Sequence, residues 1–183
     1  MAQKYAAYDL TGAIVAYYDS IDSPVPAGLP VLEITEAEWL LCIATPSYTV
    51  VDGALVAPAA KTDAELLVGA QSAKNSNLSV ECAAAIKAGF TSNALGSQYA
   101  YPSGLTDQSN HITVSNCSTG GLLWCESGGT WSLIEHSQAQ AQAVVASFGE
   151  WLNRCQSQLV ALTATVDAAK TVDAVEAILW ASP

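Results

Sequence analysis

The chain has 183 residues, of which 51% are apolar and 13% charged, so it is long and apolar enough to form a packed core. Its formal net charge is −11, and its six Lys and Arg residues are scattered. This excludes a basic nucleic-acid surface, because phosphate binding requires clustered cations. Apolar runs such as AIVAYY and LLCIA are far shorter than the roughly 20 residues of a membrane-spanning helix. The first ten residues lack the apolar core of a signal peptide, so we expect a cytoplasmic chain with no membrane partner.

Residues 1–60 predict a small β-rich module. Two apolar runs flank residues 9–12 and predict a hairpin, and a later strand leads into a short helix. Thr35 and Glu38 form a capping box, in which each side chain satisfies a free backbone N–H group beside the other residue. The Asp-Gly pair at 52–53 predicts a second hairpin.

Residues 61–183 predict a separate domain, which makes the chain α+β. Thr62 and Glu65 form another capping box, and Gly89 suits the left-handed stop of the helix that Thr62 begins. The polar run KNSN at 74–77 weakens this helix and favours a kink.

The segment 91–116 is rich in Ser, Asn and Gly. It predicts an ordered polar loop with a short strand around Tyr99 and a short helix at 107–114. One interpretation is a structural connection whose polar side chains cap turns. The other is a recognition surface that includes Tyr99, Tyr101 and Asn110, because a loop of this length is uncommon unless it is used.

A hairpin follows around the Gly-Gly pair at 128–129, with Trp124 and Trp131 on half-buried arms. Ser137 and Gln140 then cap a long helix whose apolar residues alternate at spacings of four and three. This heptad seam predicts lengthwise packing on another helix, within the chain or between chains. Its positions are Ala141, Val145, Phe148, Leu152, Cys155, Leu159, Leu162, Val166 and Ala169.

After a break, Thr171 caps a last short helix. Its predicted apolar face consists of Val172, Val175, Ile178 and Leu179. The expected partner of the long helix within the chain is the helix that begins at Thr62.

The sequence gives little support for catalysis. Only His111 and His136 could activate a nucleophile, and no GxSxG or cysteine-protease motif accompanies either. His136 precedes a helix cap, where a staple or surface residue is usual. Asp107 and His111 are spaced i, i+4, but two ligands do not make a metal site, and no HExxH or CxxC motif is present. We expect no enzyme activity, no metal and no cofactor.

The five cysteines show no metal or redox spacing. The first interpretation is that they are buried or half-buried thiols. The second is late oxidation after release from the cell, with Cys117 and Cys125 as the pair nearest in sequence.

Several motifs in combination resemble a known group of phage proteins. AGFTSNALGSQYAY, DQSNHI, the tryptophan-bearing hairpin, EHSQAQAQAVV and AAKTVDAVEAILW lie in order between residues 62 and 180. Together they resemble an uncharacterised C-terminal domain of bacteriophage tail-fibre and tail-fibre-assembly proteins. EITEAEW and YTVVDGALV resemble the small N-terminal module of tail-fibre assembly proteins. The pattern often has Asn-Leu after DQ and His-Thr before the long helix, where this chain has Ser109-Asn110 and His136-Ser137.

The resemblance implies a protein that binds, caps or helps to fold a trimeric tail fibre, working in the host cytoplasm and then either leaving or staying in the virion tail. The resemblance carries no established activity. Alternatives are a structural tail or baseplate subunit in many copies, and a receptor-binding or glycan-acting tip with a pocket that holds Asp107 and His111. The candidate partner-binding residues are Trp39, Tyr99, Tyr101, Asn110, Trp124 and Trp131.

Overall fold

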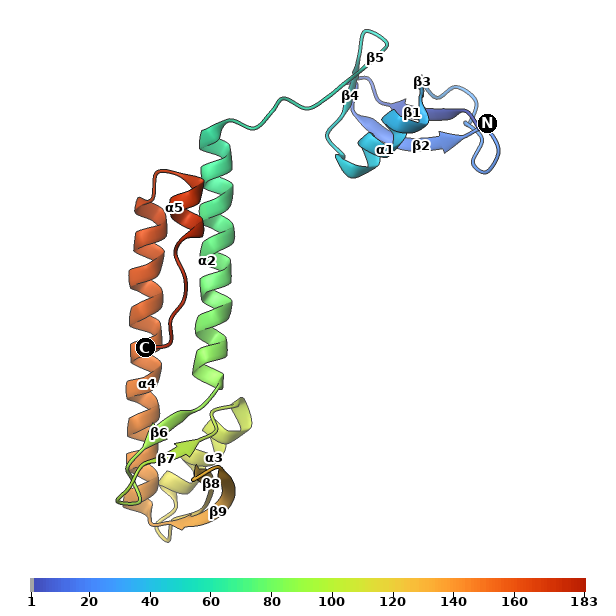
Figure 1. Ribbon diagram of the computed structural model, residues 1–183. Helices are drawn as coiled ribbons and strands as arrows, with labels where there is room; N and C mark the ends of the chain where they lie inside the picture. The colour runs from blue at the N-terminus through green and yellow to red at the C-terminus, as the bar shows by residue number, and fades with distance from the viewer. Residues whose placement is uncertain (1) are drawn as a thin grey trace. The chain divides into compact units, whose positions relative to one another are not determined.

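The computed structural model describes residues 2–183, and the chain forms two compact units, Met1–Lys61 and Thr62–Pro183 (Figure 1). The division falls one residue beyond the boundary expected from the sequence. Both units combine strands and helices, so the predicted α+β class is confirmed.

The first unit is a three-stranded antiparallel sheet with one helix and a separate hairpin. The strand order is β2-β1-β3, with β1 in the centre. The elements are β1 (Lys4–Tyr8), β2 (Ile14–Asp19), β3 (Val31–Ile34), α1 (Glu36–Ala44), β4 (Thr49–Val51) and β5 (Ala54–Val56). Both predicted hairpins form, and Asp52 and Gly53 adopt positive φ values of 51° and 75°, as a tight turn between β4 and β5 requires.

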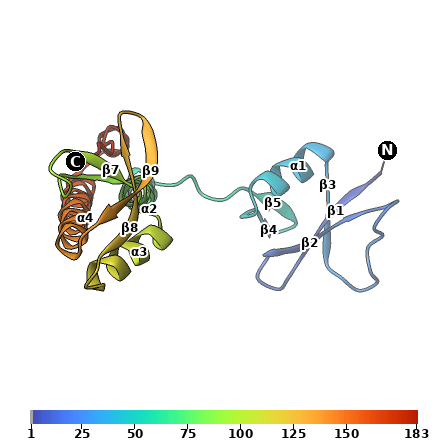
Figure 2. The same ribbon diagram turned by 90° about the horizontal axis from the view of Figure 1, so that it is seen from below.

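Three helices of the second unit lie side by side: α2 (Asp63–Lys87), α4 (Gln138–Ala168) and α5 (Val172–Glu176) (Figures 1 and 2). The polar run at 74–77 does not interrupt α2. Instead, Lys74 Nζ donates to the carbonyls of Glu176 and Ile178 at 3.1 and 2.9 Å, and Asn75 donates to Asp167 at 3.0 Å. These polar residues therefore bind the segments packed beside the helix.

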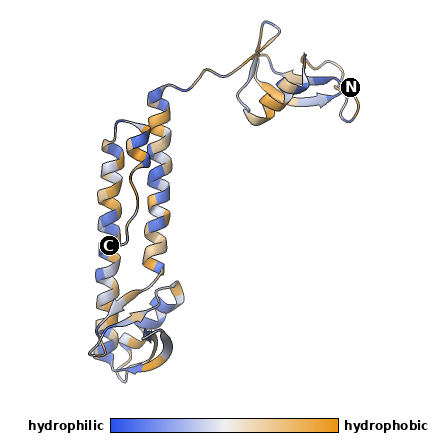
Figure 3. Cartoon of the chain, in the orientation of Figure 1, coloured by the Kyte–Doolittle hydropathy of each residue, from blue (hydrophilic) through white to orange (hydrophobic). Residues whose placement is uncertain are grey.

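The core at the helical end of the second unit is formed by Leu78, Val166 and Val175, which are fully buried. The C-terminal part of the α4 seam, from Leu159 to Ala169, therefore packs beside α2 within the chain. The N-terminal seam residues Ala141 and Phe148 pack instead in the core at the other end of the unit. Figure 3 shows apolar and polar residues interspersed along each of the two helices. The predicted apolar face at the C-terminus is wrong at Leu179, which is exposed, whereas Trp180 packs against this core. Because α5 ends at Glu176, helical spacing no longer applies beyond it.

The other end of the second unit is a four-stranded antiparallel sheet in the order β6-β7-β8-β9, joined by α3. The elements are β6 (Phe90–Ser92), β7 (Tyr99–Tyr101), α3 (Leu105–Asn116), β8 (Gly121–Ser127) and β9 (Thr130–His136). The segment 91–116 is thus mostly regular structure, and its helix is two residues longer at each end than predicted. The core at this end of the unit consists of Phe90, Tyr101, Leu123, Cys125, Ala141 and Val144.

Candidate functional site

The hairpin of β8 and β9 has one buried face and one exposed face, because successive side chains of a strand point to opposite sides. Leu123 and Cys125 point into the core. The opposite face carries four large apolar side chains that are about half exposed, which we call the hairpin face. They are Leu122 (53% exposed), Trp124 (47%), Trp131 (50%) and Leu133 (49%).

The strand register makes the hairpin face continuous. Trp124 lies directly opposite Leu133, and Trp131 lies opposite Glu126 two pairs further along the ladder, which is the next pair on the same face. Side chains at such positions are within contact distance across the two strands. Single exposed apolar residues are ordinary, but neighbouring tryptophans and leucines on one sheet face are typical of a protein-interaction surface.

The two tryptophans of this face are predicted from the sequence, whereas Leu122 and Leu133 are not. Their signal is the period-two spacing, since each leucine lies two residues from a tryptophan on the same strand.

A cavity of about 120 Å³ lies between α3 and the hairpin. From α3 it is lined by Asp107, Asn110 and His111, and from the hairpin by Leu122, Leu123, Trp124 and Leu133. The structure therefore brings Asn110 and Trp124, two of the predicted partner-binding residues, to one place. It also places Asp107 and His111 at the same cavity.

The His111 ring is buried against aromatic edges, with its centroid 5.9 Å from that of Phe90 and 6.1 Å from that of Tyr101. Its Nδ1 atom has no hydrogen-bond partner among the described residues. Burial lowers the pKa of His111, and the nearby Asp107 carboxylate opposes this only in part. Asp107 itself accepts a hydrogen bond from the Gly104 N–H at 3.1 Å. The cavity wall thus combines a neutral imidazole with a carboxylate.

The prediction of Tyr101 as a surface contact is wrong, because its side chain is fully buried. Its ring stacks on Phe90 at 5.7 Å, and its hydroxyl lies 2.9 Å from His136 Nε2. His136 Nδ1 lies 2.9 Å from the Ile134 carbonyl, which can only accept, so Nδ1 donates and Nε2 accepts the tyrosine proton. Burial raises the pKa of Tyr101, so the phenol keeps that proton.

The sequence predicts His136 as a staple or surface residue, and the surface alternative is wrong, because the side chain is buried. The physical reason is its place in the ladder. His136 pairs with Gly121 and shares the inward parity of Ile134, which packs on the core. The strand therefore extends to the residue that precedes the helix cap.

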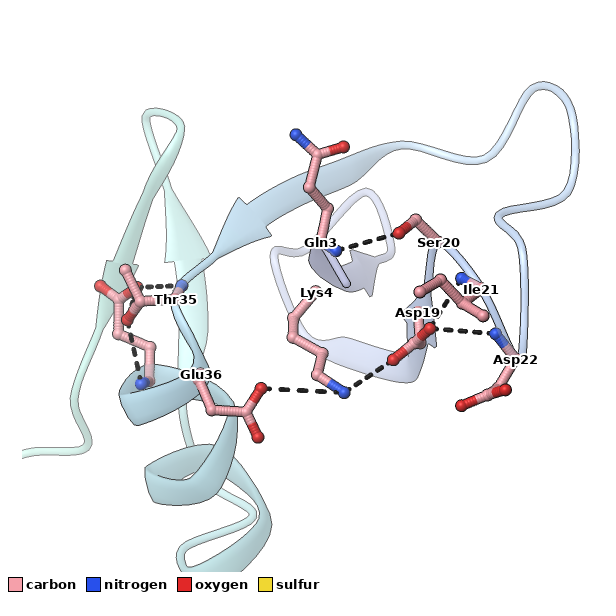
Figure 4. Close-up of polar contacts among 9 residues, drawn as sticks. Gln3, Lys4, Asp19, Ser20, Ile21, Asp22, Thr35 and Glu36 are labelled. Carbon is pink, nitrogen blue, oxygen red and sulfur yellow. Dashed lines mark hydrogen bonds and ion pairs between the residues drawn. The ribbon is translucent and has the colours of Figure 1, made fainter. Parts of the chain in front are cut away.

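Of the other predicted contacts, Tyr99 is half-buried and packs against the same core, so only part of its ring faces solvent. Trp39 belongs to the first unit, on α1. Lys4 Nζ lies 4.4 Å from its ring centroid, and the same ammonium lies 2.7 Å from Asp19 and 3.8 Å from Glu36 (Figure 4). Trp39 thus makes a cation–π contact with Lys4 within its own unit.

The cysteines divide into one exposed and four buried thiols, and all five are free. The hydroxyl of Thr119 lowers the pKa of the exposed Cys117. Cys125 is buried on the inner face of β8, which does not favour its oxidation with Cys117. The buried-thiol interpretation is therefore supported for Cys42, Cys82, Cys125 and Cys155.

Within residues 2–183, no group of three or more His, Cys, Asp or Glu side chains is placed to hold a metal ion. The helices of this range are also too short or too polar to cross a lipid bilayer. Comparisons of the chain with protein-family models, with curated proteins and with solved structures find no match.

Proposed function

We propose that the chain is a non-enzymatic, phage tail-fibre-associated protein that binds the fibre, either as a cap on its tip or as an assembly chaperone. The observation that carries the proposal is the hairpin face, where two tryptophans and two leucines are about half exposed beside one another. The motif resemblance to tail-fibre proteins supplies the identity of the partner.

The hairpin face can contribute a useful share of binding free energy. Full burial of a large apolar side chain is worth about 1.5–3 kcal/mol, so burying the exposed half of each contributes on the order of 1 kcal/mol. The four side chains together give about 4 kcal/mol, which corresponds to a roughly thousandfold change in affinity. The tryptophans account for the larger part, as is usual at interface hot spots.

The folding of a fibre chain is a step at which such a protein can act. Strands that pair over long sequence separations fold slowly and expose apolar surface and free edges while doing so. A partner that covers the fibre tip during this time suppresses aggregation in the host cytoplasm. The acidic net charge of −11 limits self-association of the partner itself.

The test is co-expression of the tagged chain with the phage's own tail-fibre protein, followed by affinity capture and titration. The double variant Trp124→Ala/Trp131→Ala should weaken fibre binding by about tenfold to a hundredfold, on the order of 1–3 kcal/mol. The matched control is Val80→Ala/Val160→Ala, which removes two exposed apolar side chains from α2 and α4. Equal affinity of all three proteins would remove the hairpin face from the proposal.

Quantitative mass spectrometry of mature particles separates the two forms of the proposal. A fixed copy number identifies a cap that stays in the virion tail. Absence from particles, combined with fibreless tails when the gene is deleted, identifies a chaperone that leaves. A high copy number with cross-links between neighbouring copies would instead favour the alternative of a structural tail or baseplate subunit.

The cavity beside the hairpin face supports a second candidate, a receptor-binding tip that contacts bacterial surface glycans. Its wall holds a tryptophan, a carboxylate and an amide, from Trp124, Asp107 and Asn110. Such groups can stack on a sugar ring and bind its hydroxyls. Saturable binding of surface glycans that Trp124→Ala abolishes, with no fibre binding, would establish this candidate over the first.

A further inference from the structure

The cavity between α3 and the hairpin opens beside the hairpin face and shares Leu122, Trp124 and Leu133 with it. A partner that covers the hairpin face therefore also covers the cavity. Its volume of about 120 Å³ corresponds to about four water molecules at about 30 Å³ each. This is room for the end of one side chain.

The chemistry of the cavity favours a cation. Of the described residues that line it, only Asp107 is formally charged, and its carboxylate is half-buried. The neighbouring His111 is buried and has its pKa lowered, so it adds no positive charge at neutral pH. The Trp124 ring can attract a cation through its π face, and Asn110 offers an amide oxygen as an acceptor.

The rest of the wall suits the stem of a long basic side chain. Leu122 and Leu133 are apolar and lie where the cavity meets the hairpin face. Lysine and arginine bury their methylene stems on such surfaces while the charged end binds a polar group. The net charge of −11 also steers a basic partner segment towards this chain.

We infer that the cavity holds a lysine or arginine side chain of the bound partner, with its ammonium or guanidinium on Asp107 and its stem between Trp124 and Leu133. This inference rests on the proposed function, since the partner is the chain that covers the hairpin face. It adds the partner's chemistry: an apolar segment with one basic anchor.

The test is titration of the full-length protein with n-butylguanidinium and n-butylammonium, followed by NMR of the Trp124 indole N–H and the His111 ring. We expect saturable shifts with dissociation constants on the order of millimolar, because the probes are small. The neutral analogue n-pentanol and the sugars glucose and N-acetylglucosamine should not bind at these concentrations. Added salt should weaken cation binding, since the attraction is electrostatic.

The variant Asp107→Asn should weaken cation binding by about tenfold, and Glu150→Gln, an exposed change on α4, should leave it unchanged. Asp107→Asn keeps a side-chain oxygen that can accept the Gly104 N–H, so α3 retains its cap. Equal binding of n-pentanol, preferential binding of a sugar, or no saturable shift with either cation would each overturn the inference.

The fibre titration separates this inference from the proposed function. If Trp124→Ala/Trp131→Ala weakens fibre binding and Asp107→Asn leaves it unchanged, the basic-anchor inference is overturned and the proposed function stands. If both cations bind and the fibre does not, the cavity's preference for a cation is supported, and the proposed function fails.

Discussion

Removing one hydroxyl tests whether Tyr101 is a core residue. In Tyr101→Phe the ring keeps its stacking on Phe90, and only the hydrogen bond to His136 Nε2 is lost. That nitrogen is then left in the core without its partner, while Nδ1 stays bound to the Ile134 carbonyl. An unpaired buried acceptor costs about 1–3 kcal/mol, so we expect a loss of about 2 kcal/mol in the free energy of unfolding.

The assay is urea unfolding at pH 7.5 followed by tryptophan fluorescence in a Trp39→Phe background, which leaves all reporters in the second unit. The midpoint should fall with an unchanged slope, as expected when only native stability changes. The control is Tyr99→Phe, which removes the same atom from a half-buried ring and should change stability by less than about 0.5 kcal/mol. Equal, small effects of the two substitutions would refute the buried hydrogen bond and return Tyr101 to the candidate surface residues.

Three further predictions concern the same unit. Gly120→Ala should prevent the sheet from forming, because φ is +73° and a Cβ atom would lie 1.9 Å from the His136 carbonyl oxygen. The control is Gly129→Ala, which is also at positive φ but has open space around it. It should lower the free energy of unfolding in urea by only about 1–2 kcal/mol. Burial lowers the pKa of His111 in the folded state. As the pH falls, the His111 imidazole is therefore protonated in the unfolded chain before it is protonated in the folded chain. Stability from this residue is therefore present above about pH 6.5 and declines below it. His111→Phe should lose less stability than wild type between pH 7.5 and 5.5. Iodoacetamide should alkylate Cys117 alone in the native protein, and the other four cysteines only in urea, by intact mass.

Local signals predicted much of the secondary structure. The Thr35, Thr62 and Ser137 caps form as expected, each with a reciprocal hydrogen bond from the residue three positions on. The Asp-Gly and Gly-Gly turns also close the expected hairpins. These features depend on a few adjacent residues, so a single sequence contains the information needed to find them.

The site depended on information that is not local. Tyr101 and Asn110 lie in the same polar segment, yet Tyr101 is buried because β7 joins the sheet, whereas Asn110 lies on α3 beside the cavity and stays exposed. The cavity forms only because α3 packs beside β8, which no periodicity in either segment indicates. The prediction for Leu179 is wrong for a related reason, because it requires the helix to continue past Glu176.

Hydroxyl-radical footprinting of the chain, alone and in complex with the tail-fibre protein, identifies the surface that the fibre covers. Five tryptophans report on five positions, and oxidation of each is read by mass spectrometry of its peptide. We expect Trp124 and Trp131 to lose most of their oxidation in the complex, while Trp39, Trp151 and Trp180 keep theirs. Protection of Trp39 alone, or unchanged oxidation of Trp124 and Trp131 in a complex that forms, would contradict the hairpin face as the fibre-binding surface.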